Sequence, residues 1–401
     1  MNKIISVLVV FSMLICMTGC SGTTDIEKRA VVQIVGIDIE NKKFEVSMQI
    51  FAPDGEMLEK KGGAKADVVT GTGNSIDFAI KEIEMKTGKE VFLGHNMLLF
   101  LGESTRNENI NDLLEYFTQG EYIFPGLDIV MTNGKAFDFI SLKLSTGLIS
   151  SQTMEDILKI SIENGNAKRA QLAKVVSDVR QIQKTAAIPI VYITKIAQDA
   201  KANEDVKASK DVKVNKDVKE NSDSEDDKTQ DTKVLSFSKT AVFKDNRYIM
   251  SLDKEQTMGL KWLTNEVKKS FSSIDVNGVP VGVSIEKAKT TLRPRIIGDK
   301  VVIDTQIKIS ASASGNLSLI SKNSSDLESL IKKKIKNQIV SQCESTQEIL
   351  LEKYKADVLD IEKLLRYYQR SFYLESRDDY EKVLQNTSYE ISIKCDLKTH
   401  K

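Results

Sequence analysis

Cys20 is the residue of this chain whose chemistry its neighbours predict most directly. A charged N-terminus is followed by a mostly apolar run from Ile4 to Met17, and this run ends in Thr18-Gly19-Cys20. A charged start, an apolar stretch of this length and small residues before the cut are the parts of a secretory signal. Because a cysteine follows directly, the pattern is typical of a bacterial lipobox, in which the thiol is joined to a diacylglycerol before cleavage. The sequence therefore predicts a signal peptide at residues 1–19 and a lipid anchor on Cys20.

Two other interpretations of these residues stay open. The first is an ordinary cleaved signal with a coincidental cysteine. The second is an uncleaved helix, although the run is short of the about 20 apolar residues that a membrane-spanning helix needs. All three interpretations leave the rest of the chain outside the cytoplasm. Because two or more acyl chains hold a protein stably on a bilayer, the lipid anchor predicts a location on the extracytoplasmic face of a membrane.

Histidine, the commonest general base, is scarce in this sequence. His95 and His400 are the two histidines, and His400 is the penultimate residue. A catalytic triad would have to use His95, but we expect His95 to hydrogen-bond the backbone of the loop that enters a buried strand. No pair of histidines or cysteines has the spacing of a zinc site. We therefore expect no catalytic residue, no metal site and no cofactor.

Other polar patterns have simple structural interpretations. Gly71-Thr72-Gly73 precedes an expected helix start at Asn74, where an anion could bind. The Lys-Ser or Lys-Thr continuation of a phosphate loop is absent, so we expect a turn. Neighbouring carboxylates such as Glu82 and Glu84 lack the apolar surroundings that raise a pKa. These residues give no indication of an enzyme.

Composition limits the remaining classes. Basic and acidic residues are equal in number, 57 of each, whereas a nucleic-acid-binding protein needs a basic excess. About 380 residues follow the signal, enough for two or three domains. No later run is apolar enough to cross a bilayer.

Residues 20–195 are expected to form an N-terminal α/β domain. The runs 30–39 and 43–51 are rich in β-forming residues and flank a short polar turn, which predicts an antiparallel hairpin. Strand-like and helix-like segments then alternate, beginning with a helix that starts at Asn74 and ends at Gly88. This alternation predicts an α/β layer.

Residues 196–234 are expected to form a disordered linker or loop insertion. From Gln198 to Lys233 there is no aromatic residue, and the tripeptide Asp-Val-Lys recurs. Such a segment cannot bury enough apolar surface to offset the entropy of ordering. A tether that binds a partner and a solvated connector both fit this composition.

Residues 235–401 are expected to form a C-terminal α+β domain, with an antiparallel sheet packed by long helices. The apolar stripe of a long helix includes Cys343, and a final strand carries Cys395 on one face. These two cysteines form a disulfide if helix and strand bring them together, or they are buried free thiols. The single tryptophan, Trp262, is expected in the core. The overall fold class is α+β with several domains.

Several strings of residues together resemble one family, the Ger(x)C lipoproteins, which are the C subunits of nutrient germinant receptors in endospore-forming bacteria. The order of the strings along nearly the whole chain is more specific than any one of them. In chain order they are Thr18-Gly19-Cys20, Val35-Gly36-Ile37-Asp38, Thr87-Gly88-Lys89, Phe92-Leu93-Gly94-His95, Leu101-Gly102-Glu103, Ala241-Val242-Phe243-Lys244, Gly259-Leu260-Lys261-Trp262-Leu263 and Tyr354-Lys355-Ala356-Asp357.

Two features depart from the family. Ser21 follows the anchor cysteine where members often carry Trp and an acidic residue, and the tract 198–233 replaces a shorter connection. The resemblance implies a subunit without catalytic activity that assembles with A-type and B-type integral membrane subunits in the inner membrane of the dormant spore. It also implies that nutrient recognition belongs to a transporter-like membrane subunit. The alternative class is a solute-binding lipoprotein that delivers a small nutrient to a transporter, but the helical second half supplies no matching lobe.

Overall fold

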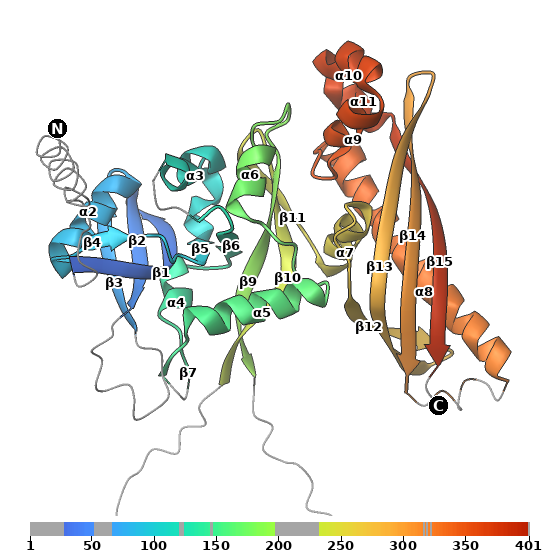
Figure 1. Ribbon diagram of the computed structural model, residues 1–401, viewed down its shortest axis with the longest axis horizontal. Helices are drawn as coiled ribbons and strands as arrows, with labels where there is room; N and C mark the ends of the chain where they lie inside the picture. The colour runs from blue at the N-terminus through green and yellow to red at the C-terminus, as the bar shows by residue number, and fades with distance from the viewer. Residues whose placement is uncertain are drawn as a thin grey trace, which may run out of the picture.

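Two large β-sheets with helices packed on them form most of the described part of the chain in the computed structural model (Figure 1). The structure describes residues 28–51, 66–119, 124–144, 147–196, 232–315, 317, 320 and 323–399. Cys20, His400 and nearly all of the tract 198–233 lie outside these residues, so the expectations for them stay predictions. None of the helices in the described part of the chain is long and apolar enough to cross a membrane.

The first sheet has the strand order β11-β10-β9-β6-β5-β1-β2-β3, and β4 pairs with the start of β1. Its strands are β1 (Arg29–Glu40), β2 (Lys43–Phe51), β3 (Ala66–Gly73), β4 (Glu90–Phe92), β5 (Leu98–Leu101), β6 (Asp128–Thr132), β9 (Ala186–Ile196), β10 (Thr232–Lys244) and β11 (Arg247–Leu252). β1 and β2 form the expected antiparallel hairpin, and Asn41 and Lys42 between them both have positive φ, 53° and 63°. A two-residue turn of this kind matches the twist of its strands. β5 and β6 extend the sheet in parallel beside β1.

Helices cover both faces of this sheet. They are α2 (Ile76–Thr87), the 3₁₀ helix η3 (Glu103–Asn107), α3 (Ile110–Gln119), α4 (Ala136–Ile140), α5 (Ser151–Glu163) and α6 (Leu172–Asp178), and a small ladder joins β7 (Lys143–Leu144) to β8 (Gly147–Leu148). Buried residues of α2, α3 and α6 share one core cluster, and those of α4 and α5 share a second. All four residues of β5 are buried, as in parallel strands that are covered on both sides. The expected α/β layer is confirmed.

β10 and β11 belong to the first sheet, although the sequence assigns residues from 235 onward to a C-terminal domain. β10 pairs antiparallel with β9, from Thr232 opposite Ile196 to Phe243 opposite Ala186. Pairing with β10 satisfies the backbone hydrogen bonds that an open edge of β9 would expose. The polar composition of the tract 198–233 does not indicate that the strands before and after it pair with each other. The first sheet therefore continues past this tract and ends at Leu252.

The second sheet has the strand order β12-β13-β14-β15. Its strands are β12 (Ser270–Val276), β13 (Val279–Ile297), β14 (Lys300–Ser314) and β15 (Thr387–Thr399). β12, β13 and β14 are antiparallel, as expected, whereas β15 runs parallel to β14, which corrects the expectation of a wholly antiparallel sheet. The helices between β14 and β15 return the chain to the end at which β14 began, and a strand that starts there runs parallel to it.

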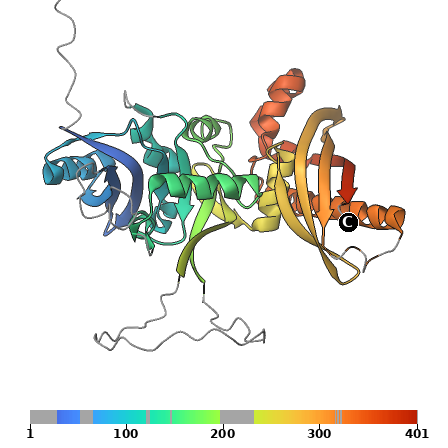
Figure 2. The same cartoon turned by 60° about the horizontal axis from the view of Figure 1, so that its bottom comes forward.

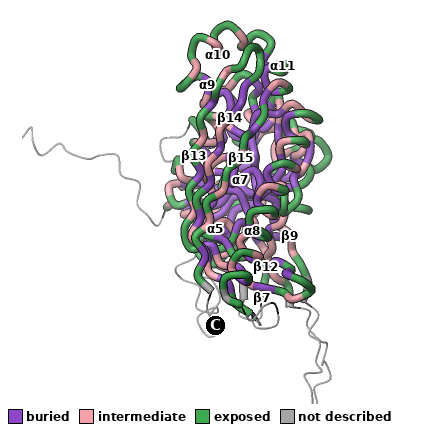
Figure 3. The backbone as a smooth tube through the Cα atoms, turned by 90° about the vertical axis from the view of Figure 1, so that its right-hand side faces the viewer, coloured by how far each residue is buried: buried purple, intermediate pink, exposed green. Residues whose placement is uncertain are grey.

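Helices connect the first sheet to the second and cover the second. They are α7 (Lys254–Leu263), α8 (Ser324–Gln347), the π-helical segment η5 (Glu348–Lys353), α9 (Ile361–Tyr368), α10 (Arg370–Ser376), the 3₁₀ helix η6 (Arg377–Asp379) and α11 (Tyr380–Gln385). α8 lies along β13, β14 and β15 with its apolar stripe buried (Figures 1 and 2). α7 lies between the two sheets, and α9, α10 and α11 cluster at one end of the second sheet. Figure 3 shows buried residues throughout the interior and an exposed surface on α10, which has no buried residue.

Cys343 on α8 and Cys395 on β15 are free thiols, the first buried and the second half-buried. Burial raises the pKa of Cys343 to about 12. The Cys343 thiol is therefore un-ionised at neutral pH and packs as a small apolar side chain.

Candidate functional site

Specific polar contacts between distant parts of the described chain lie where its two halves meet. We call residues 28–252, which carry the first sheet, the N-terminal half, and residues 254–399, which carry α7 and the second sheet, the C-terminal half. Besides hydrogen bonds such as that from Thr257 to Thr240 and the ion pair of Lys244 with Glu381, two sets of polar contacts join these halves. The first involves the loop after α6 and the segment before α9, and the second involves α7 and the loop after α5.

The first contact is made by side chains that bind backbone groups. The amide of Gln183 donates from Nε2 to the carbonyl oxygen of Lys355 at 3.0 Å, and its Oε1 accepts the backbone N–H of Asp357 at 2.8 Å. Thr185 donates from Oγ1 to the carbonyl oxygen of Asp357 at 2.8 Å. Gln183, Thr185 and Asp357 are buried, and a polar group that is buried without a partner costs about 1 to 3 kcal/mol. We call these three hydrogen bonds the Gln183 clasp.

The carboxylate of Asp357 holds the start of α9. Its Oδ1 accepts the backbone N–H of Ile361 at 2.9 Å, and its Oδ2 accepts the backbone N–H of Glu362 at 2.7 Å and the hydroxyl of Tyr380 at 2.7 Å. Asp360, at the N-cap, has φ 60° and makes no capping side-chain bond, so Asp357 supplies the acceptors that the first turn needs. Burial raises the pKa of Asp357 to about 6, although these hydrogen bonds favour the ionised form.

Four charged groups form a network of ion pairs between α6 and the start of α9. Lys363 bridges Asp178 and Asp360, with both N···O distances 2.8 Å, and Lys174 binds the same two carboxylates at 2.5 and 3.2 Å. Burial alone would raise the pKa of Asp360, but the ammonium groups of Lys174 and Lys363 outweigh it and lower that pKa. Because each lysine binds an aspartate from each half, the network ties α6 to α9.

The second contact depends on a lysine that is buried on α7. Lys261 donates from Nζ to the carbonyl oxygens of Ile162 and Ala167, the latter at 2.9 Å. Burial lowers the pKa of Lys261 to about 8. Beside it, Lys168 forms an ion pair with Glu266. An ammonium group that binds two backbone carbonyls fixes the direction of α7 relative to the loop after α5.

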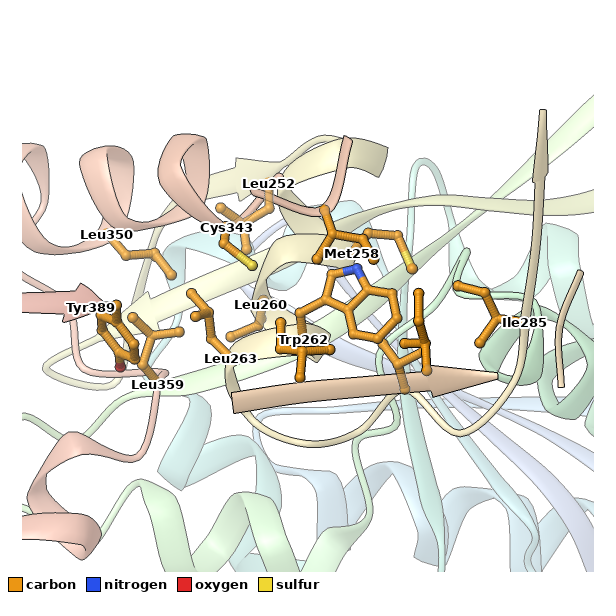
Figure 4. Packing of buried hydrophobic residues seen from close by; sticks show 14 of the residues in the cluster. Leu252, Met258, Leu260, Trp262, Leu263, Ile285, Cys343, Leu350, Leu359 and Tyr389 are labelled. Carbon is orange, nitrogen blue, oxygen red and sulfur yellow. The ribbon is translucent and has the colours of Figure 1, made fainter. Parts of the chain in front are cut away.

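α7 packs directly on α8 because of a glycine. A Cβ on Gly259 would lie 2.1 Å from the carbonyl oxygen of Gln342, which no real contact allows. The neighbouring Trp262 is buried in the core between the sheets (Figure 4), and its indole N–H donates to Oε1 of Gln342 at 3.0 Å. The expectation that Trp262 belongs to the core is confirmed.

The strings Val35–Asp38 and Leu101–Glu103 have a similar structural role within the N-terminal half. Asp38 is buried, and its carboxylate accepts the backbone N–H groups of Ala136 at 2.9 Å and Phe137 at 3.2 Å, so it caps α4. A Cβ on Gly102 would lie 1.8 Å from Oδ1 of Asp38. The glycine therefore leaves the space that the carboxylate occupies. Desolvation by burial raises the pKa of Asp38, against these two backbone hydrogen bonds.

The residues that the sequence singles out for chemistry are not brought together. His95 is exposed and contacts the ring of Phe92 edge-on, with ring centroids 6.0 Å apart. The structure describes no hydrogen bond from His95 to the loop backbone. No group of three or more potential metal ligands exists among the described residues.

The glycines at 71 and 73 lie within β3 rather than in the expected turn. A Cβ on Gly71 would lie 2.1 Å from the carbonyl oxygen of Ala79, so the glycine allows α2 to pack directly on the strand. Glu82 of α2 accepts the backbone N–H of Thr72 at 2.5 Å, and this hydrogen bond, with those from the Lys86 and Thr72 side chains, lowers its pKa to about 2. This carboxylate is a structural acceptor.

Sequence reasoning identified the strings but not what they do. It gave no interpretation of Lys261 beyond its place in a matching string, and it did not single out Gln183 or Thr185. A signal was present for Lys261, because a charged residue between Leu260 and Trp262 in an apolar helix needs buried acceptors. Gln183 carries no such signal, because an amide in a polar loop is ordinary.

Two family models match the chain in order. One, described as "Spore germination protein N-terminal domain", matches residues 22–193, and the other, described as "Spore germination B3/ GerAC like, C-terminal", matches residues 238–401. Among solved structures, the crystal structure of the GerBC protein superposes with a TM-score of 0.55 at 15% identity, and the alignment covers 90% of this chain and 96% of that one. At this identity the likeness shows a shared α+β fold. No curated protein matches this chain.

Proposed function

The chain belongs to the family of spore germination proteins that are C subunits of germinant receptors, and from that premise we propose that it is the lipid-anchored, non-catalytic subunit of a nutrient germinant receptor. Cys20 carries the lipid, and the folded body lies on the extracytoplasmic face of the spore inner membrane. There it assembles with A-type and B-type integral membrane subunits and couples them. It binds no nucleic acid, and the nutrient is recognised elsewhere in the receptor.

The observation that carries this proposal is the match of both family domains in order along the chain, 22–193 and 238–401. The structure adds where the matching strings lie. Asp357 and Lys261 join the two halves, and Asp38 caps a helix. These residues fix how the two halves are arranged. A fixed arrangement suits a subunit that acts by binding its partners through its surface.

The position of Cys20 limits how far the body can stand from the membrane. Lys28, the first residue that the structure describes, is eight positions after Cys20. A chain of this length spans at most about 30 Å. Under the proposal, the end of the N-terminal half at β1 and β4 therefore lies within about 30 Å of the bilayer.

The test is a Cys20→Ala variant in spores, with Cys395→Ser as the control for loss of a cysteine. We expect Cys20→Ala to leave the membrane fraction and to lower the rate of nutrient germination or the level of the receptor. Mass spectrometry of the wild-type N-terminus should show a diacylglycerol on Cys20. If the released variant supports normal germination, the anchoring part of the proposal is wrong.

The solute-binding alternative is tested on purified residues 21–401. Calorimetric titration with amino acids, sugars and bile salts should show no heat of binding. Binding at micromolar concentration would favour a solute-binding lipoprotein instead.

A further inference from the structure

The helix pair α9–α10 presents an unusual group of exposed aromatic and apolar side chains. Tyr367 is 80% exposed, Tyr368 is 51% exposed and Leu374 is 49% exposed. The two tyrosine rings contact each other edge-on, with centroids 4.7 Å apart. We call this group, together with Arg366 and Arg370, the α9–α10 surface; it lies on the helices at the upper end of the C-terminal half in Figure 1.

Two hollows flank Tyr367. The larger has a volume of about 470 Å³ and is lined by Ser177, Lys363, Arg366, Tyr367, Arg370, Tyr373 and Leu374. The smaller has a volume of about 310 Å³, and Tyr367, Tyr368, Leu292 and Leu364 are among its lining residues. Ser177 belongs to α6 and the other residues of the larger hollow to α9 and α10, so this hollow lies between the two halves of the chain. Tyr367 therefore lines both recesses and lies between them.

The charge of the larger hollow is one-sided. Its lining includes three cationic side chains and no carboxylate. Lys363 is engaged with Asp178 and Asp360, whereas Arg366 pairs with Glu362 at the longer distance of 3.8 Å. Arg370 has no carboxylate partner among the described residues. Two guanidinium groups are thus available to bind carboxylates, which they bind in a planar, bidentate manner.

The α9–α10 surface is held in place by hydrogen bonds within the C-terminal half. Asp357 fixes the start of α9. Gln369, between the two helices, donates from Nε2 to the carbonyl oxygen of Pro294 at 3.0 Å, and the hydroxyl of Tyr373 donates to Glu362 at 3.2 Å. A surface that is already ordered loses little conformational entropy when a partner binds it.

We propose that the α9–α10 surface is the docking site for a carboxylate-bearing protein segment of a membrane-embedded receptor subunit. Tyr367 is the anchor, and Arg366 and Arg370 pair with the acidic groups. Exposed Tyr and Arg beside recesses are the residues that dominate protein interfaces. Segments that bind an anionic bilayer carry clusters of about 4 to 8 Lys and Arg, more than the three cations of this hollow. This inference rests on the proposed function, because it names the surface through which the subunit assembles.

The first test places a photoreactive phenylalanine analogue at position 367 of the full-length protein in spores. The control position is Phe271, which is 61% exposed on β12 in the second sheet. We expect cross-linking to an A-type or B-type subunit from position 367 and not from position 271. Cross-linking to a second copy of this chain, to lipid alone or to nothing would overturn the proposal.

The second test measures co-purification of detergent-solubilised receptor with the double variant Tyr367→Ala/Arg370→Glu. Because both side chains are outside the core, the melting temperature should match that of wild type. We expect recovery of the membrane subunits to fall by about tenfold or more, and the control variant Phe271→Ala to behave as wild type.

The two levels of the proposal fail in different ways. If wild-type protein retains no membrane subunit, the proposed function is wrong. If wild type and the double variant retain the subunits equally, the proposed function stands and the α9–α10 surface is not the docking site. A partner variant with an acidic residue changed to Lys should restore binding of an Arg370→Glu protein.

Discussion

Gln183 and Asp357 are 174 positions apart and lie in different halves of the chain, yet the side-chain amide of Gln183 accepts the backbone N–H of Asp357 at 2.8 Å. The same amide donates to the carbonyl of Lys355. The Gln183 side chain thus satisfies one backbone N–H group and one backbone carbonyl in the segment before α9, as a paired strand would do in a sheet. The carboxylate of Asp357 in turn starts α9, which carries the proposed docking surface. The relative placement of the halves and the shape of that surface are therefore linked.

Gln183→Ala should loosen the contact between the halves. The change removes two hydrogen bonds and leaves the N–H of Asp357 buried without an acceptor, which costs about 1 to 3 kcal/mol of unfolding free energy. Urea denaturation measures it. The control is Gln152→Ala, whose amide binds Asp156 on the surface of α5. Equal stability of the two variants would show that the Gln183 clasp contributes nothing.

Asp357→Asn should change how stability depends on pH. Burial raises the pKa of Asp357 from 3.8 to about 6, so between these pH values the folded protein holds a proton that the unfolded chain has released. The contribution of Asp357 to the unfolding free energy therefore falls as pH rises from about 4 to about 6, by up to about 3 kcal/mol. The variant lacks this titration.

The measurement is the difference in unfolding free energy between wild type and variant at pH 4, 5, 6 and 7. Relative to Asp357→Asn, wild type should lose stability across this range. Asp378→Asn, at an exposed carboxylate, serves as control. A wild-type minus Asp357→Asn difference that is constant with pH would contradict the prediction.

Lys261→Met should weaken the second contact and remove an alkaline pH dependence. The carbonyl oxygens of Ile162 and Ala167 lose their donor, which costs about 1 to 3 kcal/mol. Because burial lowers the pKa of Lys261 to about 8, the unfolded chain binds a proton that the folded protein lacks above this pH. Wild type therefore gains stability from Lys261 between about pH 8 and 10, and the variant does not. The measurement is the unfolding free energy from chemical denaturation over pH 7–10. Lys269→Met, at an exposed lysine, is the control. Unfolding free energies of wild type and Lys261→Met that change in parallel with pH would refute the prediction.

Gly102→Ala should destabilise the N-terminal half. The new Cβ would lie 1.8 Å from Oδ1 of Asp38 and would displace the carboxylate that caps α4. We expect a loss of about 1 to 3 kcal/mol, seen in calorimetry as a lower melting temperature. Gly134→Ala is the matched control, because a Cβ there meets nothing within 4 Å. Equal melting temperatures for the two variants would show that Asp38 has room to move.

The local parts of the fold were predictable and the long-range parts were not. The β1–β2 hairpin follows from two β-rich runs around a short turn, and the buried stripe of α8 follows from its apolar spacing. The pairing of β9 with β10 and the parallel direction of β15 depend on partners far away in the sequence. Residue type and spacing do not encode which edge a strand joins, because the same side chains suit either direction.

By itself, the sequence determined the family, the predicted anchor at Cys20, the scarcity of catalytic residues and most local elements. These depend on short-range patterns such as apolar periodicity, turn residues and ordered strings. Only the tertiary structure decided that Gln183 hydrogen-bonds the backbone of Asp357 and that Lys261 is buried against backbone carbonyls. It also decided that Tyr367 is exposed and lines two recesses. Burial and hydrogen-bond partners arise when distant segments pack together, so a residue's identity fixes what it can bind while the fold fixes what it meets.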